Sequence, residues 1–302
     1  MTLIVAAALS ALAVGGFVNL AERYGLGKSV RKDGPQSHLV KEGTPTMGGL
    51  AFLLTALLVW LLFGVKSADG IAVALLTLAA GALGLYDDAL ALQRKRKVAL
   101  GEDASTGLLA RYRLLGQGAF ALLFGIYAVR AGHSMLGPDV LDVLAFAFVV
   151  VGAINALNFS DGLDGLAAGM SVIMLLPFLA APFAAPLLGA LLGFLWHNCR
   201  PASVFMGGVG SEALGAALAG VAITSGWVWY LPLIAAVPVA EVLSVIVQVG
   251  YFRLSSGKRI FKMSPLHHHF EESGWDESKV VLRFWVLTAA SVALAVYLRG
   301  IL

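Results

Sequence analysis

Stretches of about 20 mostly apolar residues fill this sequence, and an α-helix needs that length to cross a bilayer. Only 13% of the 302 residues are charged, whereas soluble domains carry roughly 25%. We therefore predict an all-α polytopic membrane protein, with residues 1–302 forming a single integral-membrane domain. Ten spans are expected, at residues 2–20, 47–65, 69–86, 114–131, 139–158, 166–184, 185–197, 210–228, 230–252 and 281–300.

Lys and Arg residues are concentrated in three segments that ten spans would place on one side of the membrane. Of the 21 such residues, 5 lie in 21–46, 6 in 87–113 and 5 in 253–280. Cytoplasmic loops carry an excess of this kind, so this side is expected to be cytoplasmic, with both termini outside. The single cysteine, Cys199, excludes an internal disulfide and a cysteine-rich metal site.

Adjacent acids, Asp87 and Asp88, stand where the third apolar stretch is expected to end. Carboxylates at a membrane edge are costly to desolvate, so they indicate function. Such a pair binds a hard cation such as Mg²⁺ or shares a proton as base and acid. The alternative is a solvated helix end, which a helix dipole disfavours for acids.

The segment NALNFSDGLDGLAAG carries two amides and two acids, Asn155, Asn158, Asp161 and Asp164. Its glycines suit a tight turn at which the backbone approaches a ligand before the next helix begins. The acids could hold a metal or accept hydrogen bonds from a sugar or base. A plain helix-capping turn would explain Asp164 alone.

Two further segments carry polar groups on the same side. The histidines His267, His268 and His269 cannot all face one ligand from one helix, because successive residues diverge by about 100°. One or two of them suit phosphate binding or proton transfer, and a plain surface is the alternative. Lys41 with Thr46 and a glycine pair suits phosphate contact, or a loop that caps a helix.

A further acid is expected within the ninth span. Glu241 follows Pro238 in the ninth span, where an acid is functional by default or a hydrogen-bonded support of a bend. Together, acids, amides, histidines and a lysine on one side indicate chemistry between a cytosolic phosphate compound and a lipid phosphate. A transporter is the alternative, although transporters place such groups near the bilayer midplane.

Seven motifs occur in an order that resembles the phospho-N-acetylmuramoyl-pentapeptide transferases, from about Gly34 to Trp275. They are GPQSHLVKEGTPTMGG, YDDALALQRKRK, ARYRLLGQ, NALNFSDGLDGLAAG, FMGGVGSEALGA, PVAEVLSVIVQV and SPLHHHFEESGW. The Asp pair and DGLDGLA are shared with the wider polyprenyl-phosphate sugar-1-phosphate transferases. The histidine loop argues against the rival function in that superfamily, GlcNAc-1-phosphate transfer.

The resemblance implies that UDP-MurNAc-pentapeptide and undecaprenyl phosphate give lipid I and UMP with Mg²⁺, in the bacterial cytoplasmic (inner) membrane. It implies the bilayer as surroundings, a possible homodimer and no nucleic-acid partner. The catalytic residues would be Asp87, Asp88, Asp161 and His267, and the first three would also bind the metal. The substrate-binding residues would be Lys41, Thr46, Asn155, Asn158, Gly162, Leu163, Asp164, Phe205, His268 and His269. A groove beside the bent ninth span would admit the lipid tail.

Gly208 is where the chain departs from the resemblance, because the related motif reads FMGD-x-GS and its Asp is a direct Mg²⁺ ligand. Loss of that carboxylate should weaken Mg²⁺ binding, since Mg²⁺ has few protein ligands. Glu212, where the family usually has an apolar residue, is a possible substitute about 6 Å further along a helix. The alternatives are a weaker enzyme that uses the remaining acids, or an inactivated relative. His197 is a second departure.

Overall fold

The computed structural model describes residues 1–25, 27, 41, 43–99 and 110–301, with the backbone alone for 95–99. Half of the motif at 34–49 lies outside this part of the chain, and so do the basic residues at 28, 31 and 32 that we expected on the cytoplasmic side. The regular structure of the described residues is helical. The elements are α1 (Thr2–Arg23), α2 (Gly49–Phe63), α3 (Ala68–Ala99), α4 (Ala110–Arg130), α5 (Asp139–Ser160), α6 (Leu166–Leu175), η2 (Leu176–Phe178), α7 (Ala184–Asn198), α8 (Gly207–Thr224), η3 (Val228–Tyr230), α9 (Leu231–Ile234), α10 (Ala236–Leu254), α11 (Leu266–Glu271) and α12 (Glu277–Ile301).

Every predicted span coincides with helix, but three predicted boundaries are wrong, one of them at the end of α3, which continues to Ala99. The span expected at 166–184 ends at Leu175, because Pro177 follows in the short 3₁₀ helix η2 and proline cannot supply the N–H that an α-helix needs. The span expected at 230–252 is divided at Ala235 into α9 and α10. Pro238 lies in the first turn of α10, where a missing N–H has no cost.

Seven of the described helices are long and apolar enough to cross a membrane, namely α1, α3 as far as Arg94, α4, α5, α8, α10 and α12. Shorter apolar helices cover Gly49–Phe63 and Leu166–Phe178. The described part of the chain is therefore that of a polytopic, all-helical membrane protein, as predicted.

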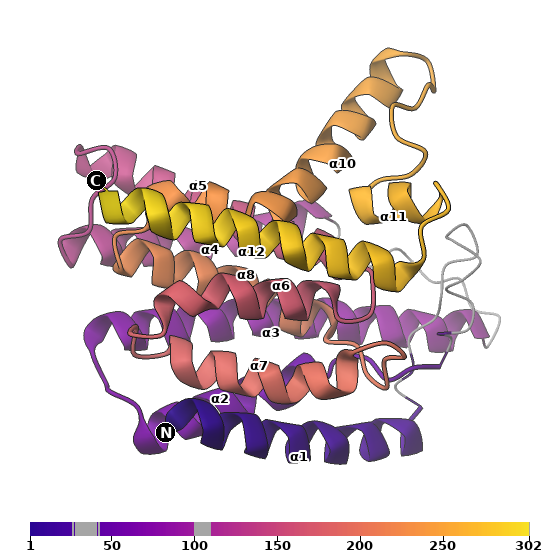
Figure 1. Cartoon of the computed structure of the whole chain (residues 1–302), viewed down its shortest axis with the longest axis horizontal. Helices are drawn as coiled ribbons and strands as arrows, with labels where there is room; N and C mark the ends of the chain where they lie inside the picture. Colours follow the sequence, from indigo (N-terminus) through magenta and orange to yellow (C-terminus); the bar gives the residue numbers. More distant parts are fainter. Residues whose placement is uncertain (26, 28–40, 42, 100–109, 302) are drawn as a thin grey trace.

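Helix α8 lies at the centre of the bundle (Figure 1), and its residues from Val209 to Ile223 are buried. Small residues allow its neighbours to approach closely, as is usual where membrane helices pack. A Cβ atom added at Gly84 of α3 would lie 2.3 Å from the carbonyl oxygen of Gly208, and one at Gly215 would lie 2.5 Å from the carbonyl oxygen of Ala153 in α5. Close packing thus fixes the start of α8 against α3.

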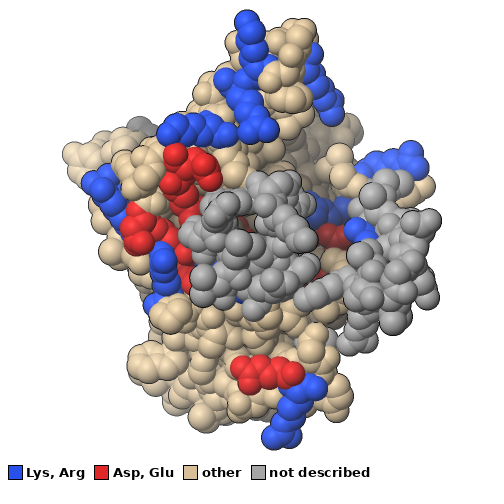
Figure 2. Space-filling view, turned by 90° about the vertical axis from the view of Figure 1, so that its right-hand side faces the viewer, with Lys and Arg blue, Asp and Glu red and all other residues tan. Residues whose placement is uncertain are grey.

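Polar and charged groups gather at one end of the bundle, on the right in Figure 1. This end holds the C-terminal parts of α3 and α10, the short helix α11 and the start of α12. Viewed from that side, acidic and basic side chains are visible on several parts of this end (Figure 2). Helix α10 leans away from the other helices, and the chain turns back after its end to form α11 (Figure 1).

Candidate active site

The predicted acid pair lies within a helix and not at its end. Asp87 and Asp88 belong to α3, which continues to Ala99, because the following Ala, Leu, Gln, Arg and Lys residues are strong helix formers. The expectation of a helix terminus here was wrong. Asp87 Oδ2 lies 3.3 Å from the Arg113 guanidinium of α4. Asp88 Oδ2 accepts a hydrogen bond of 3.2 Å from the backbone N–H of Val209.

A buried polar row continues from this pair along α8, α4 and α5. The carboxylate of Glu212 is fully buried, and its Oε1 lies 3.6 Å from Nε of Arg113. Its Oε2 accepts a hydrogen bond of 3.0 Å from the amide of Gln117. Gln117 in turn accepts one of 2.8 Å from Asn155. Glu212 is therefore held by α4 through Arg113 and Gln117.

The donor groups of the described chain do not complete a Mg²⁺ site. Among the residues that the structure describes, no three His, Cys, Asp or Glu side chains gather closely enough to hold a metal ion. Asp87 faces the cation of Arg113, and Gly208 brings no carboxylate to the position beside Asp88, where an added Cβ would lie 3.3 Å from Asp88 Oδ1. A side chain at position 208 would thus begin beside the Asp88 carboxylate.

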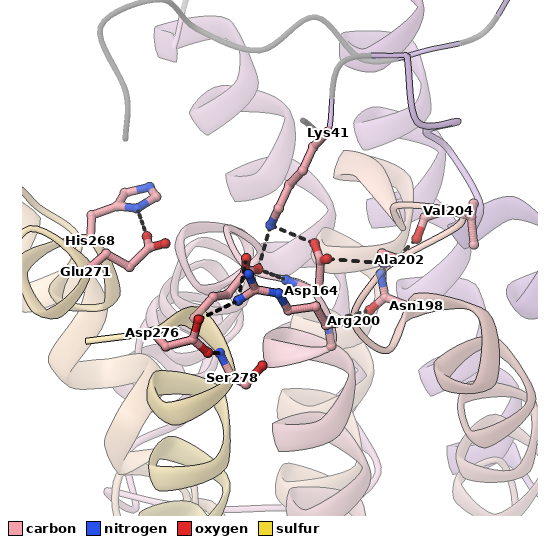
Figure 3. A network of polar contacts seen from close by, with 12 residues as sticks. Lys41, Asp164, Asn198, Arg200, Ala202, Val204, His268, Glu271, Asp276 and Ser278 are labelled. Carbon is pink, nitrogen blue, oxygen red and sulfur yellow. Dashed lines mark hydrogen bonds and ion pairs between the residues drawn. The ribbon is translucent and has the colours of Figure 1, made fainter. Parts of the chain in front are cut away.

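The DGLDG turn is held by a group of charged residues that we call the clasp: Lys41, Asp164, Arg200 and Glu277. Lys41 Nζ lies 2.7 Å from Asp164 Oδ1 and also contacts Glu277, and Figure 3 shows Lys41 pointing at Asp164. Asp164 Oδ2 accepts a hydrogen bond of 3.1 Å from the backbone of Ala202. Arg200 lies 3.3 Å from Glu277. Four segments distant in sequence meet here.

Around the clasp, the loop before α8 is joined to the turn and to the loop before α2. Asn198 accepts a hydrogen bond of 3.2 Å from the Gly165 backbone and donates one of 2.8 Å to the Val204 carbonyl. The Phe205 N–H donates to the Pro45 carbonyl at 2.8 Å, and the Gly48 N–H donates to the Phe205 carbonyl at 2.9 Å. Phe205 is thereby fixed beside buried Thr46 and Met47.

The three histidines of α11 have three different surroundings, as predicted from their spacing. His267 is buried, with Nδ1 3.2 Å from Glu241 Oε2, and its ring lies where a Cβ on Gly162 would be, 2.2 Å from Nε2. His268 lies 2.8 Å from Glu271, on the left of Figure 3. His269 Nδ1 accepts a hydrogen bond of 3.1 Å from the Lys262 backbone. His267 thus packs on the DGLDG turn and on α10.

Asn158 and Glu241 also have defined partners. Asn158 donates a hydrogen bond of 3.0 Å to Ser211 of α8, which fixes the end of α5 just before Asp161. Glu241 accepts a hydrogen bond of 3.2 Å from the His267 backbone. It therefore anchors α11 to α10 inside the protein, whereas the sequence suggested a hydrogen-bonded support of a bend in the span itself.

A pocket of about 400 Å³ opens beside α10, where a lipid groove was expected. Its lining comes from α10 and from the segment before α11, namely Gln248, Val249, Phe252, Arg253, Arg259, Met263 and Ser264. Gln248 shapes it by accepting hydrogen bonds of 3.0 Å from the backbones of Ile260 and Phe261. The groove itself stays a prediction.

The structure explains His197 and adds four polar residues that sequence reasoning did not single out. His197 Nε2 lies 2.9 Å from the Ala11 carbonyl of α1, so it joins α7 to α1. The added residues are Arg113, Gln117, Arg200 and Glu277. Arg113 and Gln117 stand at helical spacing in ARYRLLGQ, which was the available signal for them. Glu277 had none, because an acid in the first turn of a helix is ordinary.

The fold and the site define a polytopic membrane glycosyl transferase. The pattern of glycosyl transferase family 4 matches residues 70–226, which include α3, α5, the DGLDG turn and α8. A phospho-N-acetylmuramoyl-pentapeptide-transferase signature matches residues 41–53, which begin at the clasp lysine.

Full-length relatives specify the family further. Proteins named phospho-N-acetylmuramoyl-pentapeptide-transferase are similar to this chain in Deinococcus radiodurans (46% identity, 99% of both chains), Deinococcus deserti (48%, 99% of both) and Desulfotalea psychrophila (41%, 90% of this chain and 84% of that protein). The chain belongs to the phospho-N-acetylmuramoyl-pentapeptide-transferase family.

Proposed function

We propose that the protein transfers phospho-MurNAc-pentapeptide from UDP-MurNAc-pentapeptide to undecaprenyl phosphate, which gives lipid I and UMP. The observation that carries this proposal is the convergence of the family motifs at one end of the bundle. Lys41 meets Asp164 at 2.7 Å, Gly162 contacts His267, and Asp88 meets the start of α8 at 3.2 Å. These contacts between motifs from distant parts of the chain support the proposal of a shared site.

The proposed orientation has ten spans, with both termini outside and the charged end on the cytoplasmic side of the bacterial inner membrane. The distribution of Lys and Arg supports it, and so does the placement of the C-terminal ends of α1, α3 and α10 at one end of the bundle (Figure 1). This orientation exposes the site to a cytosolic nucleotide sugar and keeps it within reach of a lipid phosphate at the membrane surface. Homodimerisation stays a proposal from the resemblance alone.

In the proposed reaction, an oxygen of undecaprenyl phosphate attacks the sugar-linked phosphorus of the nucleotide. A P–O bond forms there, and the bond from that phosphorus to the bridging oxygen breaks with release of UMP. Asp87 and Asp88 would face the lipid phosphate, and one of them would act as the base. Asp161 is the other proposed catalytic residue. His267, which the resemblance implies as catalytic, is buried and would act as a positioning residue through the turn that it supports.

The nucleotide sugar would bind beside the DGLDG turn. The proposed contacts are Lys41, Thr46, Asn155, Asn158, Gly162, Leu163, Asp164, Phe205, His268 and His269. The space that Gly162 leaves by lacking a side chain is filled by the His267 ring, and an aromatic ring such as Phe205 suits stacking on uracil. The clasp neutralises Lys41 with two acids, so in the described structure Lys41 orients Asp164.

Mg²⁺ dependence is proposed from the resemblance, with Asp87, Asp88 and Asp161 as ligands, although the described residues do not complete such a site. Gly208 therefore favours a second candidate function: a relative that binds the nucleotide sugar or lipid phosphate with slow or no turnover. The remaining alternative is that the donor is UDP-GlcNAc and that GlcNAc-1-phosphate is transferred.

Release of UMP in detergent tests the proposal, with UDP-MurNAc-pentapeptide and undecaprenyl phosphate as substrates, with and without Mg²⁺. The protein is compared with its Gly208→Asp variant, and UDP-GlcNAc replaces the donor in a parallel reaction. We expect Mg²⁺-dependent release that is faster in the variant. Absence of UMP from both proteins would overturn the proposed transferase activity, and release from UDP-GlcNAc alone would assign the other substrate.

A further inference from the structure

Glu277, the first residue of α12, connects more segments of the site than its position suggests. Its side chain is only 3% exposed. Oε1 contacts Lys41 Nζ and accepts a hydrogen bond of 2.8 Å from the Asp164 backbone N–H. Oε2 lies 3.3 Å from Arg200. One carboxylate thus holds the DGLDG turn, the loop before α2 and the loop before α8.

The contacts on Asp164 leave its position dependent on Glu277. Lys41 reaches one oxygen of the Asp164 carboxylate at 2.7 Å, and the Ala202 N–H reaches the other at 3.1 Å. The backbone N–H of Asp164 is directed at Glu277. Without Glu277, a buried donor would lack its acceptor, which is costly, and Lys41 would keep a single acid. The turn and the lysine would both shift.

We propose that Glu277 is a positioning residue for the nucleotide-sugar site, which it acts on through Asp164 and Lys41. The inference rests on the proposed function, because it takes the DGLDG turn as the place where the nucleotide binds. Glu277 fixes the turn before the ligand arrives, so binding does not have to order it. Preorganisation of this kind raises affinity by lowering the ordering cost of the bound state.

Electrostatics alone would give the opposite effect, which makes the proposal testable. The clasp contains two acids, Asp164 and Glu277, and two cations, Lys41 and Arg200. Neutralising one acid leaves excess positive charge near an anionic nucleotide, which would tighten binding if charge were the only factor. If Glu277 positions the turn, the same substitution weakens binding instead.

Glu277→Gln is the test, and Asp276→Asn is its matched control. Asp276 is the neighbouring acid and lies 3.6 Å from the same Arg200, and its side chain is 64% exposed. The control therefore removes the same charge from an exposed position beside the clasp. Binding of UMP and of UDP-MurNAc-pentapeptide is measured by calorimetry in detergent. Binding of undecaprenyl phosphate and the melting temperature are measured in parallel.

We expect Glu277→Gln to weaken nucleotide binding about tenfold, which corresponds to about 1.4 kcal/mol, with binding of undecaprenyl phosphate unchanged. The control is expected to bind like the unaltered protein, and Glu277→Asp, which restores the charge, to recover part of the affinity. Unchanged or tighter nucleotide binding in Glu277→Gln would overturn the proposal.

Two outcomes keep this inference separate from the proposed function. Weakened nucleotide binding without UMP release from any variant would support the positioning role and reject the transferase activity. Normal UMP release with unchanged nucleotide affinity in Glu277→Gln would support the transferase activity and reject the positioning role. If the Gln variant does not fold, Glu277→Asp is tested in its place, and unchanged nucleotide affinity there would count against the proposal.

Discussion

Gly208 faces Asp88: a Cβ atom built on Gly208 would lie 3.3 Å from Asp88 Oδ1 and 3.3 Å from the Gly84 carbonyl oxygen. A side chain fits there with a shift of a few tenths of an ångström, and its carboxylate would stand beside that of Asp88. An acid introduced at position 208 would therefore stand near Asp88, and neighbouring carboxylates suit a hard divalent cation.

Gly208→Asp should create Mg²⁺-dependent stability. Without Mg²⁺ the new carboxylate repels Asp88, so the variant should melt below Gly208→Asn, which has the same shape without the charge. Bound Mg²⁺ at a hundredfold excess over its Kd would stabilise the variant by about 2.7 kcal/mol. The measurement is the melting temperature in detergent across a Mg²⁺ titration. An equal Mg²⁺ effect in the unaltered protein would mean that its cation ligands are already complete.

Glu212→Gln should lower stability without changing Mg²⁺ dependence. The Glu212 carboxylate accepts a hydrogen bond of 3.0 Å from Gln117 and lies 3.6 Å from Arg113. Both partners belong to α4, so the carboxylate stabilises the contact between α8 and α4. Loss of a charged hydrogen-bond partner in a buried site costs about 1–3 kcal/mol. Thermal unfolding would measure it, with exposed Glu22→Gln as the control. Loss of residual Mg²⁺-dependent UMP release in Glu212→Gln would show instead that Glu212 replaces the missing ligand.

Apolar length was enough to predict the helices, because a span must satisfy every backbone group internally and so has few alternatives. The sequence indicated a bend near Pro238, but it indicated neither the break at Ala235 nor the continuation of α3 beyond Asp88. The first depends on how α9 and α10 pack on their neighbours. The second occurs because helix-forming residues carry α3 onwards after its apolar part ends.

For the site, sequence patterns identified the polar segments but not the pairs between them. Lys41 and Glu277 are 236 positions apart, and no local pattern predicts a contact at that separation. Gly208 was noticed only because a family motif differs there. Its position beside Asp88 depends on the close packing of α3 on α8, which the structure provides.

Gly215→Ala should destabilise the bundle, whereas Gly152→Ala should not. A Cβ on Gly215 would lie 2.5 Å from the backbone of α5, while one on Gly152 meets nothing within 4 Å. Overpacking a well-packed core costs about 1–3 kcal/mol. Both glycines lie in helices, so the gain in helix propensity is matched. Melting temperatures of the two variants in one detergent would compare them, and equal values would contradict close packing at α8.

The thiol of Cys199 should react slowly at neutral pH although the residue is exposed. Partial desolvation raises the pKa of Cys199 above its ordinary value, so the reactive thiolate is scarce below that pKa and increases as the pH rises through it. Alkylation by iodoacetamide between pH 7 and 10, followed by mass spectrometry, would measure the rate. A cysteine-containing peptide is the control. If Cys199 reached its full alkylation rate at the same pH as the peptide thiol, or at a lower pH, the expectation would be contradicted.

Gly162→Ala should disturb the site through His267, whose ring occupies the space that the new methyl group needs. The added Cβ would lie 2.2 Å from His267 Nε2, and Glu241 holds this histidine through both its ring and its backbone. We expect nucleotide affinity to fall about tenfold, or by about 1.4 kcal/mol. Calorimetry with UMP is the measurement, and Glu272→Ala on the exposed side of the loop is the control.

A double variant separates this steric effect from a chemical role of the histidine. His267→Ala removes the ring that clashes, so Gly162→Ala combined with His267→Ala should melt higher than the sum of the single effects predicts. Residues in contact show such non-additivity at about 0.5–3 kcal/mol. Additive losses would mean that the DGLDG turn and α11 do not touch at this point, and the assignment of His267 as the support of the turn would be wrong.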